Sequence, residues 1–278
     1  AIDMGADYIE PDLVITKDGV LVARHDPWLS DSTDVADKAE FAGRRTTLKN
    51  PEGETVTDWF VWDFTYDELM TLRAKQVREG RPTEFDGQFA IPTFAEIMLL
   101  AMETPRRSDG TRLGVYPETK WPAHHKARGL DFAPLLLEEL TALERRGALP
   151  PLYIQSFEPE ILIALNGTTD LPLIQLVYPE GWRTGGTPTV ELEELAKFAD
   201  GVGPYKAMVI NDQTGASTGY GHRAQDLGLS VHPWTFRDDD KPEHFATPED
   251  EIKAVLNAGA TGFFTDFPAT GRKAIVSE

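Results

Sequence analysis

The chain contains no cysteine among its 278 residues. Disulfide bonds and thiolate metal sites are therefore excluded, whereas the cellular compartment stays open. Long apolar runs are missing as well, because the longest tight one covers residues 97–102. A membrane-spanning helix needs ~18 such residues or more, so the sequence predicts no stable membrane insertion.

Basic residues are scarce. Lysine and arginine together number 27 against 46 aspartates and glutamates, which gives a formal net charge of −19. A field of that sign disfavours binding to nucleic acid or to an anionic membrane surface. An anionic small molecule would have to be drawn in by local positive charge or by a bound metal ion.

Length and composition fit one large globular domain. Hydrophobic residues make up 41% of the 278 positions, enough to bury a sizeable core. No period of 20 to 50 residues repeats, and no stretch is low in complexity. Single α/β barrels often have this size.

The stretch from residue 8 to residue 26 gathers charged side chains in an otherwise apolar setting. Residues 8–16 read as a strand, and its period of 2 puts Glu10 and Asp12 on one face. A turn and a second short strand follow and deliver His25 and Asp26. A lone Glu-x-Asp pair more often lies on the solvent-exposed face of a strand. The combination of two carboxylates with a histidine, however, predicts a functional site.

Strands and helices alternate along the rest of the chain, which is typical of an α/β barrel. Residues 27–92 are less regular and are predicted to be an insertion after the second barrel strand that caps the barrel mouth. We expect strands at 8–16, 113–120, 152–157, 172–178, 200–203, 229–236 and 262–266, and helices at 65–74, 93–102, 130–146, 158–165, 189–198, 219–227 and 248–257. A closed (β/α)8 barrel needs one more strand, which we expect upstream of Ala1.

Glu118 and Lys120 lie two apart at the end of a predicted strand and so share a face. The carboxylates of Glu10, Asp12 and Glu118 would make a hard oxygen site suited to Ca²⁺ or Mg²⁺. The lack of cysteine and of an H-x-x-x-H pair argues against zinc. Lys120 could equally be a structural ion pair with these acids.

The segment IEPDLVITKDGVLVARHD, residues 9–26, closely resembles the signature of the glycerophosphodiester phosphodiesterase family, which runs roughly I-E-x-D-V-x-x-T-x-D-G-x-x-V-x-x-H-D. The resemblance extends from about Gly5 to Pro268 and implies a (β/α)8 TIM barrel over residues 1–278. It implies metal-dependent hydrolysis of glycerophosphodiesters to glycerol 3-phosphate and an alcohol.

The resemblance also assigns roles to residues. Glu10, Asp12 and Glu118 would bind the divalent cation, Lys120 would contact the phosphate, and His25 would be one half of a general acid–base pair. Among further candidates, Gln155 and Trp234 would lie near the substrate, Trp234 against the glycerol. The remaining histidines rank lower: His124 and His125 as an exposed loop pair, His222 and His244 as surface residues, and His232 on a strand.

The family's other catalytic histidine belongs to a His-Arg-Gly motif, which these 278 residues do not contain. We expect it on the strand upstream of Ala1, aimed at the metal opposite His25. The first residues do not form an intact signal peptide. The insertion nevertheless resembles the longer, periplasmic or secreted bacterial branch of the family.

Two alternatives remain open at this point. One is a phospholipase D-like barrel enzyme that acts on lysophospholipid headgroups. The other is a non-catalytic barrel that kept the metal and binds the small molecule without turnover. Headgroup preference, native metal and oligomeric state are not encoded in any motif of the sequence.

Overall fold

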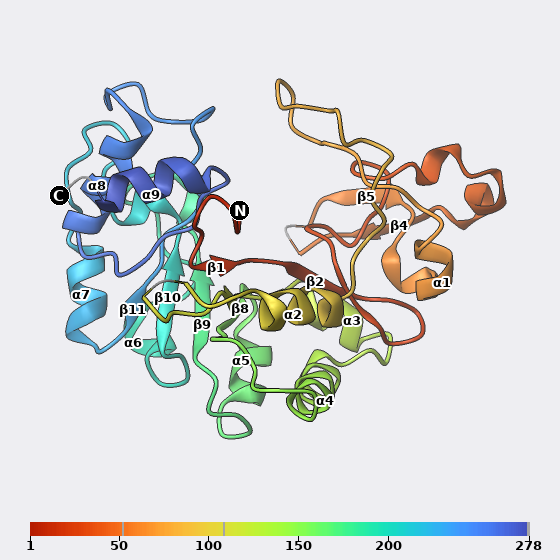
Figure 1. The fold of residues 1–278 in the computed structure, drawn as a ribbon. Coiled ribbons are helices and arrows are strands. Elements are labelled where there is room, and N and C mark those ends of the chain that lie inside the picture. Colours follow the sequence, from red (N-terminus) through yellow and green to blue (C-terminus); the bar gives the residue numbers. More distant parts are fainter. Residues whose placement is uncertain (52, 108, 277–278) are drawn as a thin grey trace. The chain divides into compact units, whose positions relative to one another are not determined.

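The computed structural model describes residues 1–51, 53–107 and 109–276, and these form two compact units (Figure 1). The first unit comprises Ala1–Ile9, Arg106–Tyr116 and Pro151–Glu278, and the second comprises Glu10–Pro105 and Pro117–Pro150. Each unit has its own strands, helices and clusters of buried side chains. The assignment of the whole chain to one barrel domain, with residues 27–92 as an insertion, stays a prediction.

The first unit is a parallel α/β arrangement. Its strands are β8 (Ile154–Ser156), β9 (Leu173–Val177), β10 (Gly201–Pro204) and β11 (Ser230–Val231), and each is parallel to the next. Its helices are α5 (Pro159–Leu165), α6 (Leu192–Leu195), α7 (Tyr220–Asp226), α8 (Pro248–Asn257) and α9 (Pro268–Val276). The 3-10 turns η4 (Glu180–Trp182) and η5 (Lys206–Met208) lie in its loops, and β1 (Tyr8–Ile9) pairs in parallel with β6 (Gly114–Val115).

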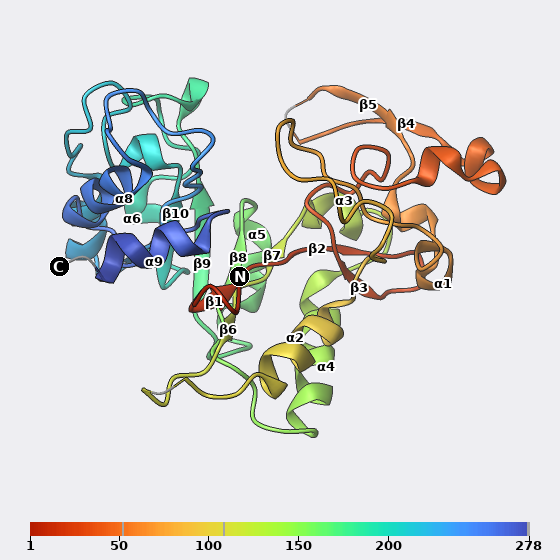
Figure 2. The same ribbon diagram turned by 45° about the horizontal axis from the view of Figure 1, so that its top comes forward.

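Burial explains why these segments form strands and helices. All five residues of β9 are buried, as expected for a parallel strand covered on both faces. Helices α8 and α9 lie side by side (Figures 1 and 2), where Val255 and Ala274 join one apolar cluster with Phe236. The start of α8 is fixed locally, since the Thr247 hydroxyl caps the helix and Asp250 completes a capping box.

The second unit contains the hairpin of β2 (Asp12–Ile15) and β3 (Leu21–Ala23), with β7 (Glu118–Thr119) parallel to β2. A further hairpin joins β4 (Thr46–Lys49) to β5 (Thr55–Asp58). Its helices are α1 (Tyr66–Leu69), α2 (Phe94–Glu103), α3 (Pro122–Lys126) and α4 (Phe132–Glu144), and its 3-10 turns are η1 (Val35–Asp37), η2 (Ala39–Arg44) and η3 (Val61–Asp63). Helices α2 and α4 lie side by side (Figure 2).

Residues 27–92 are anchored to the β2–β3 hairpin by a shared apolar cluster. Val14 and Val22 come from the hairpin. The other buried members come from residues 27–92: Leu29, Val35, Phe41, Trp59, Val61, Phe64, Leu69, Leu72 and Ile91. The segment is therefore a packed addition to the hairpin rather than a loose surface loop.

Two predicted strands are each broken at a proline. Residues 8–16 divide into β1 and β2 around Pro11, and residues 113–120 divide into β6 and β7 around Pro117. Proline has no amide hydrogen to donate to a ladder. The two interruptions fall at equivalent positions, since Ile9 pairs with Val115 before the break and Asp12 pairs with Glu118 after it.

Other boundaries also differ from those expected. Strand β11 is shorter than residues 229–236 because Pro233 cannot donate to the ladder. Residues 262–266 contain only an isolated bridge from Thr265 to Phe236 instead of a strand. Helices α3 and α9 were not expected. Among the described residues, no helix has the length and apolar character needed to cross a membrane.

Gly114 is required by the close approach of β1 and β6. A Cβ at this position would overlap the ring of Tyr8. We expect Gly114→Ala to lower the free energy of unfolding by ~1–3 kcal/mol, the usual cost of overpacking, measured by chemical denaturation. Gly43→Ala is the matched control, because nothing lies within 4 Å of its Cβ position. Equal stabilities of the two variants would contradict the proposed clash.

Candidate metal centre and active site

Three carboxylates of the second unit converge. Ligand oxygens of Glu10, Asp12 and Glu118 all lie within 4.8 Å of one another. The parallel register of β2 and β7 places Asp12 directly beside Glu118, and Glu10 stands next to the Pro11 break. Glu118 is buried, Asp12 is half-buried and Glu10 is exposed, so the cluster leads from the interior to solvent.

Lys120 is the positive charge in this cluster. Its Nζ lies 2.8 Å from Glu118 Oε1 and 3.1 Å from Asp12 Oδ1. Burial raises the pKa of Glu118, and Asp12 adds to that rise against the opposing charge of Lys120. Burial by itself lowers the pKa of Lys120, but the charges of Glu118 and Asp12 outweigh it and raise this pKa above its usual range. Lys120 therefore stays an ammonium ion at any ordinary pH.

The three carboxylates form an all-oxygen donor set, which fits a hard divalent cation. Two oxygens bound to the same Ca²⁺ at 2.3–2.6 Å can lie up to about 5 Å apart, and the observed limit of 4.8 Å satisfies this. The arrangement thus suits a metal ion, although the role of the three residues as ligands stays a prediction.

His25 lies beyond the end of β3 in the same unit. Its side chain is 75% exposed, and Nδ1 is 3.0 Å from Asp26 Oδ2. This contact engages Nδ1, so Nε2 is the nitrogen proposed to donate or accept a proton. The neighbouring Arg24 is buried and holds the loop by donating to the Trp28 carbonyl at 3.2 Å and to the Ser32 hydroxyl. Sequence reasoning overlooked Arg24.

The sequence predicts that His124 and His125 are both exposed in a loop, and this prediction is wrong for His125. The pair lies in helix α3, and His125 is fully buried with its ring edge-on to Trp62 at 5.0 Å and to Phe132 at 5.2 Å. Burial lowers the pKa of His125 to about 3, helped by the charge of Arg128. His125 is a neutral packing residue. Pro122, at the first turn of α3, was the local signal for this helix.

The other predicted substrate residues belong to the first unit. Gln155 is buried within β8. Trp234 is half-buried, and its Nε1 donates to the Gly203 carbonyl at 2.7 Å. Their roles in substrate binding stay predictions, because no ligand is present to test them.

The remaining histidines of the first unit have simple environments. His232 is buried just beyond β11, with Nδ1 2.9 Å from the Tyr116 hydroxyl, and burial lowers its pKa to about 4. His222 and His244 are exposed, as the sequence predicted.

Comparisons with known proteins give one consistent result. The model of the glycerophosphoryl diester phosphodiesterase family matches residues 1–270. A glycerophosphodiester phosphodiesterase of Arabidopsis thaliana is 34% identical over 96% of this chain and 77% of its own length. A protein of the same name from Haemophilus influenzae is 31% identical over 96% of this chain and 81% of its own length.

Solved structures agree in fold. A glycerophosphoryl diester phosphodiesterase structure from Silicibacter pomeroyi has a TM-score of 0.68 at 22% identity, covering 99% of this chain and 85% of that one. An Oleispira antarctica phosphodiesterase, solved with the product sn-glycerol-3-phosphate, has a TM-score of 0.65 at 17% identity. The alignment covers 98% of this chain and 86% of that one. These neighbours are TIM barrels, so the predicted fold class is confirmed.

Proposed function

Because the chain belongs to the glycerophosphoryl diester phosphodiesterase family, we infer that it is an enzyme that hydrolyses glycerophosphodiesters to glycerol 3-phosphate and an alcohol. The activity depends on a divalent metal. One observation on this chain's own residues supports the inference. The carboxylates of Glu10, Asp12 and Glu118 meet at Lys120 inside the matched region.

Hydrolysis requires that charge on the non-bridging phosphate oxygens be neutralised, that the nucleophile lose a proton and that the leaving oxygen gain one. A divalent cation held by Glu10, Asp12 and Glu118 supplies Lewis-acid charge neutralisation when bound. Lys120 directs its ammonium group at a phosphate oxygen as a fixed point charge. His25 exchanges a proton at Nε2 while Asp26 holds Nδ1.

Ca²⁺ or Mg²⁺ is the metal in this proposal, because both are hard cations that take carboxylate oxygens and the three carboxylates offer such a donor set. Gln155 and Trp234 complete the proposal as substrate contacts, with the indole of Trp234 against the glycerol.

Membership in the longer periplasmic or secreted branch is also part of this proposal. The packed insertion of residues 27–92 supports it, because this segment carries most of one apolar cluster. Fractionation of the source cells tests it, and recovery of the protein with cytoplasmic markers would contradict it.

The decisive experiment is product analysis by ³¹P NMR. Purified protein with Ca²⁺ and glycerophosphocholine should release glycerol 3-phosphate. Release of phosphocholine would show cleavage of the wrong P–O bond and refute the assignment. Turnover of lysophosphatidylcholine alone would favour the phospholipase D-like alternative. Saturable binding without product would favour the non-catalytic alternative.

A further inference from the structure

Two tryptophans follow the segments that carry the proposed acid–base group and the proposed phosphate contact. Trp28 comes shortly after His25, and Trp121 directly follows Lys120. Strand β2 lies between β3 and β7, which precede these two segments, so the sheet itself keeps the segments apart. The rings of Trp28 and Trp121 nevertheless contact each other, with centroids 5.6 Å apart and an angle of 62°. All of these residues belong to the second unit.

The loop that carries His25 begins at the candidate metal centre. The amide of Arg24 donates to the Asp12 carbonyl at 2.8 Å, so His25 directly follows a residue that is hydrogen-bonded to β2. The buried Arg24 side chain then donates to the Trp28 carbonyl at 3.2 Å and to the Ser32 hydroxyl. These bonds give the loop its shape, but they do not connect it to the segment after β7.

The indole of Trp28 is oriented by the same loop. Its Nε1 donates to Asp31 Oδ2 at 2.8 Å, and the ring is half-buried. The backbone of Trp28 forms a bridge with Phe60 of the insertion. Aromatic rings at this spacing and angle attract each other beyond the effect of the area that they bury. The contact with Trp121 therefore connects a well-oriented ring of the loop to the segment after β7.

Trp121 occupies a backbone conformation that tryptophan normally avoids. Its φ of 48° and ψ of 49° lie in the left-handed region, which residues other than glycine enter at a steric cost. The position is the N-cap of α3, where its carbonyl accepts from the His125 amide at 3.2 Å. Glycine would meet this backbone requirement without strain. The strained backbone thus indicates that the side chain of Trp121 has a role of its own.

The ring of Trp121 is also supported by the insertion and by α3. The ring of Trp62 lies 6.5 Å away at 36°, and the ring of His124 lies 5.0 Å away at 50°. Trp62 is buried and stacks on Phe60 with centroids 5.1 Å apart and an angle of 2°. Trp28 therefore packs against a ring that is itself held in place.

We propose that Trp28 and Trp121 are positioning residues of the hydrolysis, and that the contact between their rings holds the loop of His25 in place relative to Lys120. His25 depends on such support because its side chain is 75% exposed, and Asp26, which it contacts, belongs to the same loop. A misplacement of about 1 Å can cost ~10²-fold in rate. The effect on turnover rests on the proposed function, whereas the placement of the loop can be measured without substrate.

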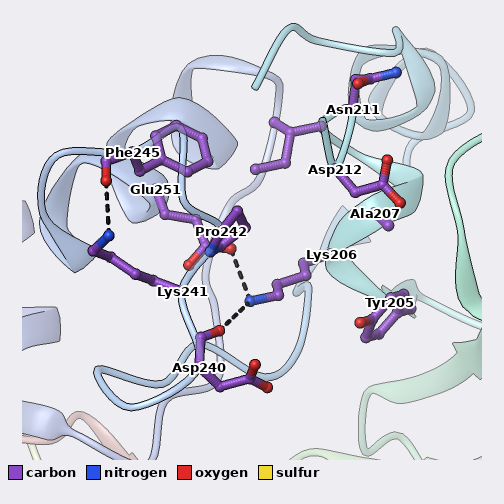
Figure 3. A pocket seen from close by; sticks show the side chains of 11 residues that line it. Tyr205, Lys206, Ala207, Asn211, Asp212, Asp240, Lys241, Pro242, Phe245 and Glu251 are labelled. Carbon is purple, nitrogen blue, oxygen red and sulfur yellow. Dashed lines mark hydrogen bonds and ion pairs between the residues drawn. The ribbon is translucent and has the colours of Figure 1, made fainter. Parts of the chain in front are cut away.

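The kinetic test removes each ring. Trp28→Leu and Trp121→Leu should each lower kcat for glycerophosphocholine by about 10- to 100-fold and leave KM and Ca²⁺ affinity nearly unchanged. The double variant should lose no more than either single variant, because both residues act through the same contact. Trp28→Phe keeps a ring and should keep most of the activity. Phe245→Leu is the matched control, since its half-buried ring lies 4.2 Å from that of His244 and lines a pocket of about 270 Å³ in the first unit (Figure 3).

The His25→Ala background distinguishes positioning from other roles. If Trp28 acts through His25, adding Trp28→Leu to His25→Ala should lower kcat by less than about twofold further. A further loss as large as the one in the wild-type background would show that the ring acts on the substrate or on the fold, and would overturn the proposal.

Trp121→Gly separates the ring from the stability of the fold. Glycine relieves the left-handed backbone, so this variant should melt no lower than Trp121→Leu. Its kcat should nevertheless be as low as that of Trp121→Leu, because the ring is missing in both. Wild-type turnover by Trp121→Gly would show that the ring of Trp121 positions nothing.

Placement of the loop is measured without substrate by ¹⁵N relaxation. In the wild type the His25 amide should have the order parameter of rigid backbone, about 0.85. Trp121→Leu, although far away in the chain, should lower it to below about 0.6, as should Trp28→Leu, whereas Phe245→Leu should not. An unchanged order parameter in both tryptophan variants would overturn the proposal whatever the catalytic outcome. If the wild type releases no glycerol 3-phosphate, the function is refuted, and the relaxation data still decide the placement.

Discussion

Glu118→Gln is expected to lower turnover by about 10³-fold or more, because a divalent cation supplies several kcal/mol of charge stabilisation to a phosphoryl transition state. Glutamine has the same shape but offers one neutral oxygen. The buried carboxylate of Glu118 also lies 2.8 Å from the ammonium group of Lys120. The substitution therefore leaves the ammonium group in place and removes part of the negative charge that attracts the metal.

The measurement is glycerol 3-phosphate release at saturating Ca²⁺, together with calorimetric titration of the metal. Glu138→Gln is the matched control, since this glutamate is exposed on α4 of the same unit. The control should keep both metal affinity and activity. Glu118→Gln protein that binds Ca²⁺ as tightly as the wild type would show that the three carboxylates are not the metal site. The same result would shift the role of Glu118 to orienting Lys120.

Local signals in the sequence were sufficient to predict where several helices begin. Helix α8 occupies the predicted residues because Thr247 and Asp250 form a capping box around Pro248. Helix α2 begins where Thr93 and Glu96 form another. Such signals depend on residues three positions apart, so no tertiary information is needed to read them.

The clustering of the three carboxylates could also be predicted from the sequence, for a different reason. Parallel strands that run side by side bring their corresponding residues together, and the register places Asp12 beside Glu118. Residue types at the ends of two predicted strands therefore indicated a cluster before any contact was known. The prolines that divide these strands were visible, but their matching positions become apparent only when β1 is aligned with β6 and β2 with β7.

What could not be predicted depends on contacts between segments far apart in the chain. His125 is buried because Trp62 and Phe132 pack against it, and Trp62 lies in the 3-10 turn η3, far from α3 along the chain. The aromatic rings that follow β8 to β11 likewise come from four separate loops. Single aromatic residues at strand ends carry no pattern in sequence, so only the pairing order of β8 to β11 shows that they meet.

His25→Ala should reduce turnover by about 10²–10⁴-fold, the usual contribution of a general acid or base. The side chain is 75% exposed and its contact in the structure is with Asp26, so its loss opens no cavity. Melting temperature and Ca²⁺ affinity should therefore stay at wild-type values while kcat falls. His222→Ala, at an exposed histidine of α7, is the control and should retain full activity.

Rescue by imidazole separates a chemical role of His25 from a structural one. Because the ring is largely exposed, its removal leaves a space open to solvent where added imidazole can exchange the same proton. Turnover of His25→Ala should then rise with imidazole concentration, whereas Glu118→Gln should not respond. Asp26→Asn should show a smaller loss, since it removes the negative charge that faces Nδ1 but keeps the ring. If His25→Ala loses less than about tenfold, or if its loss is insensitive to imidazole, His25 carries no proton in the reaction, and the general acid–base must be sought elsewhere.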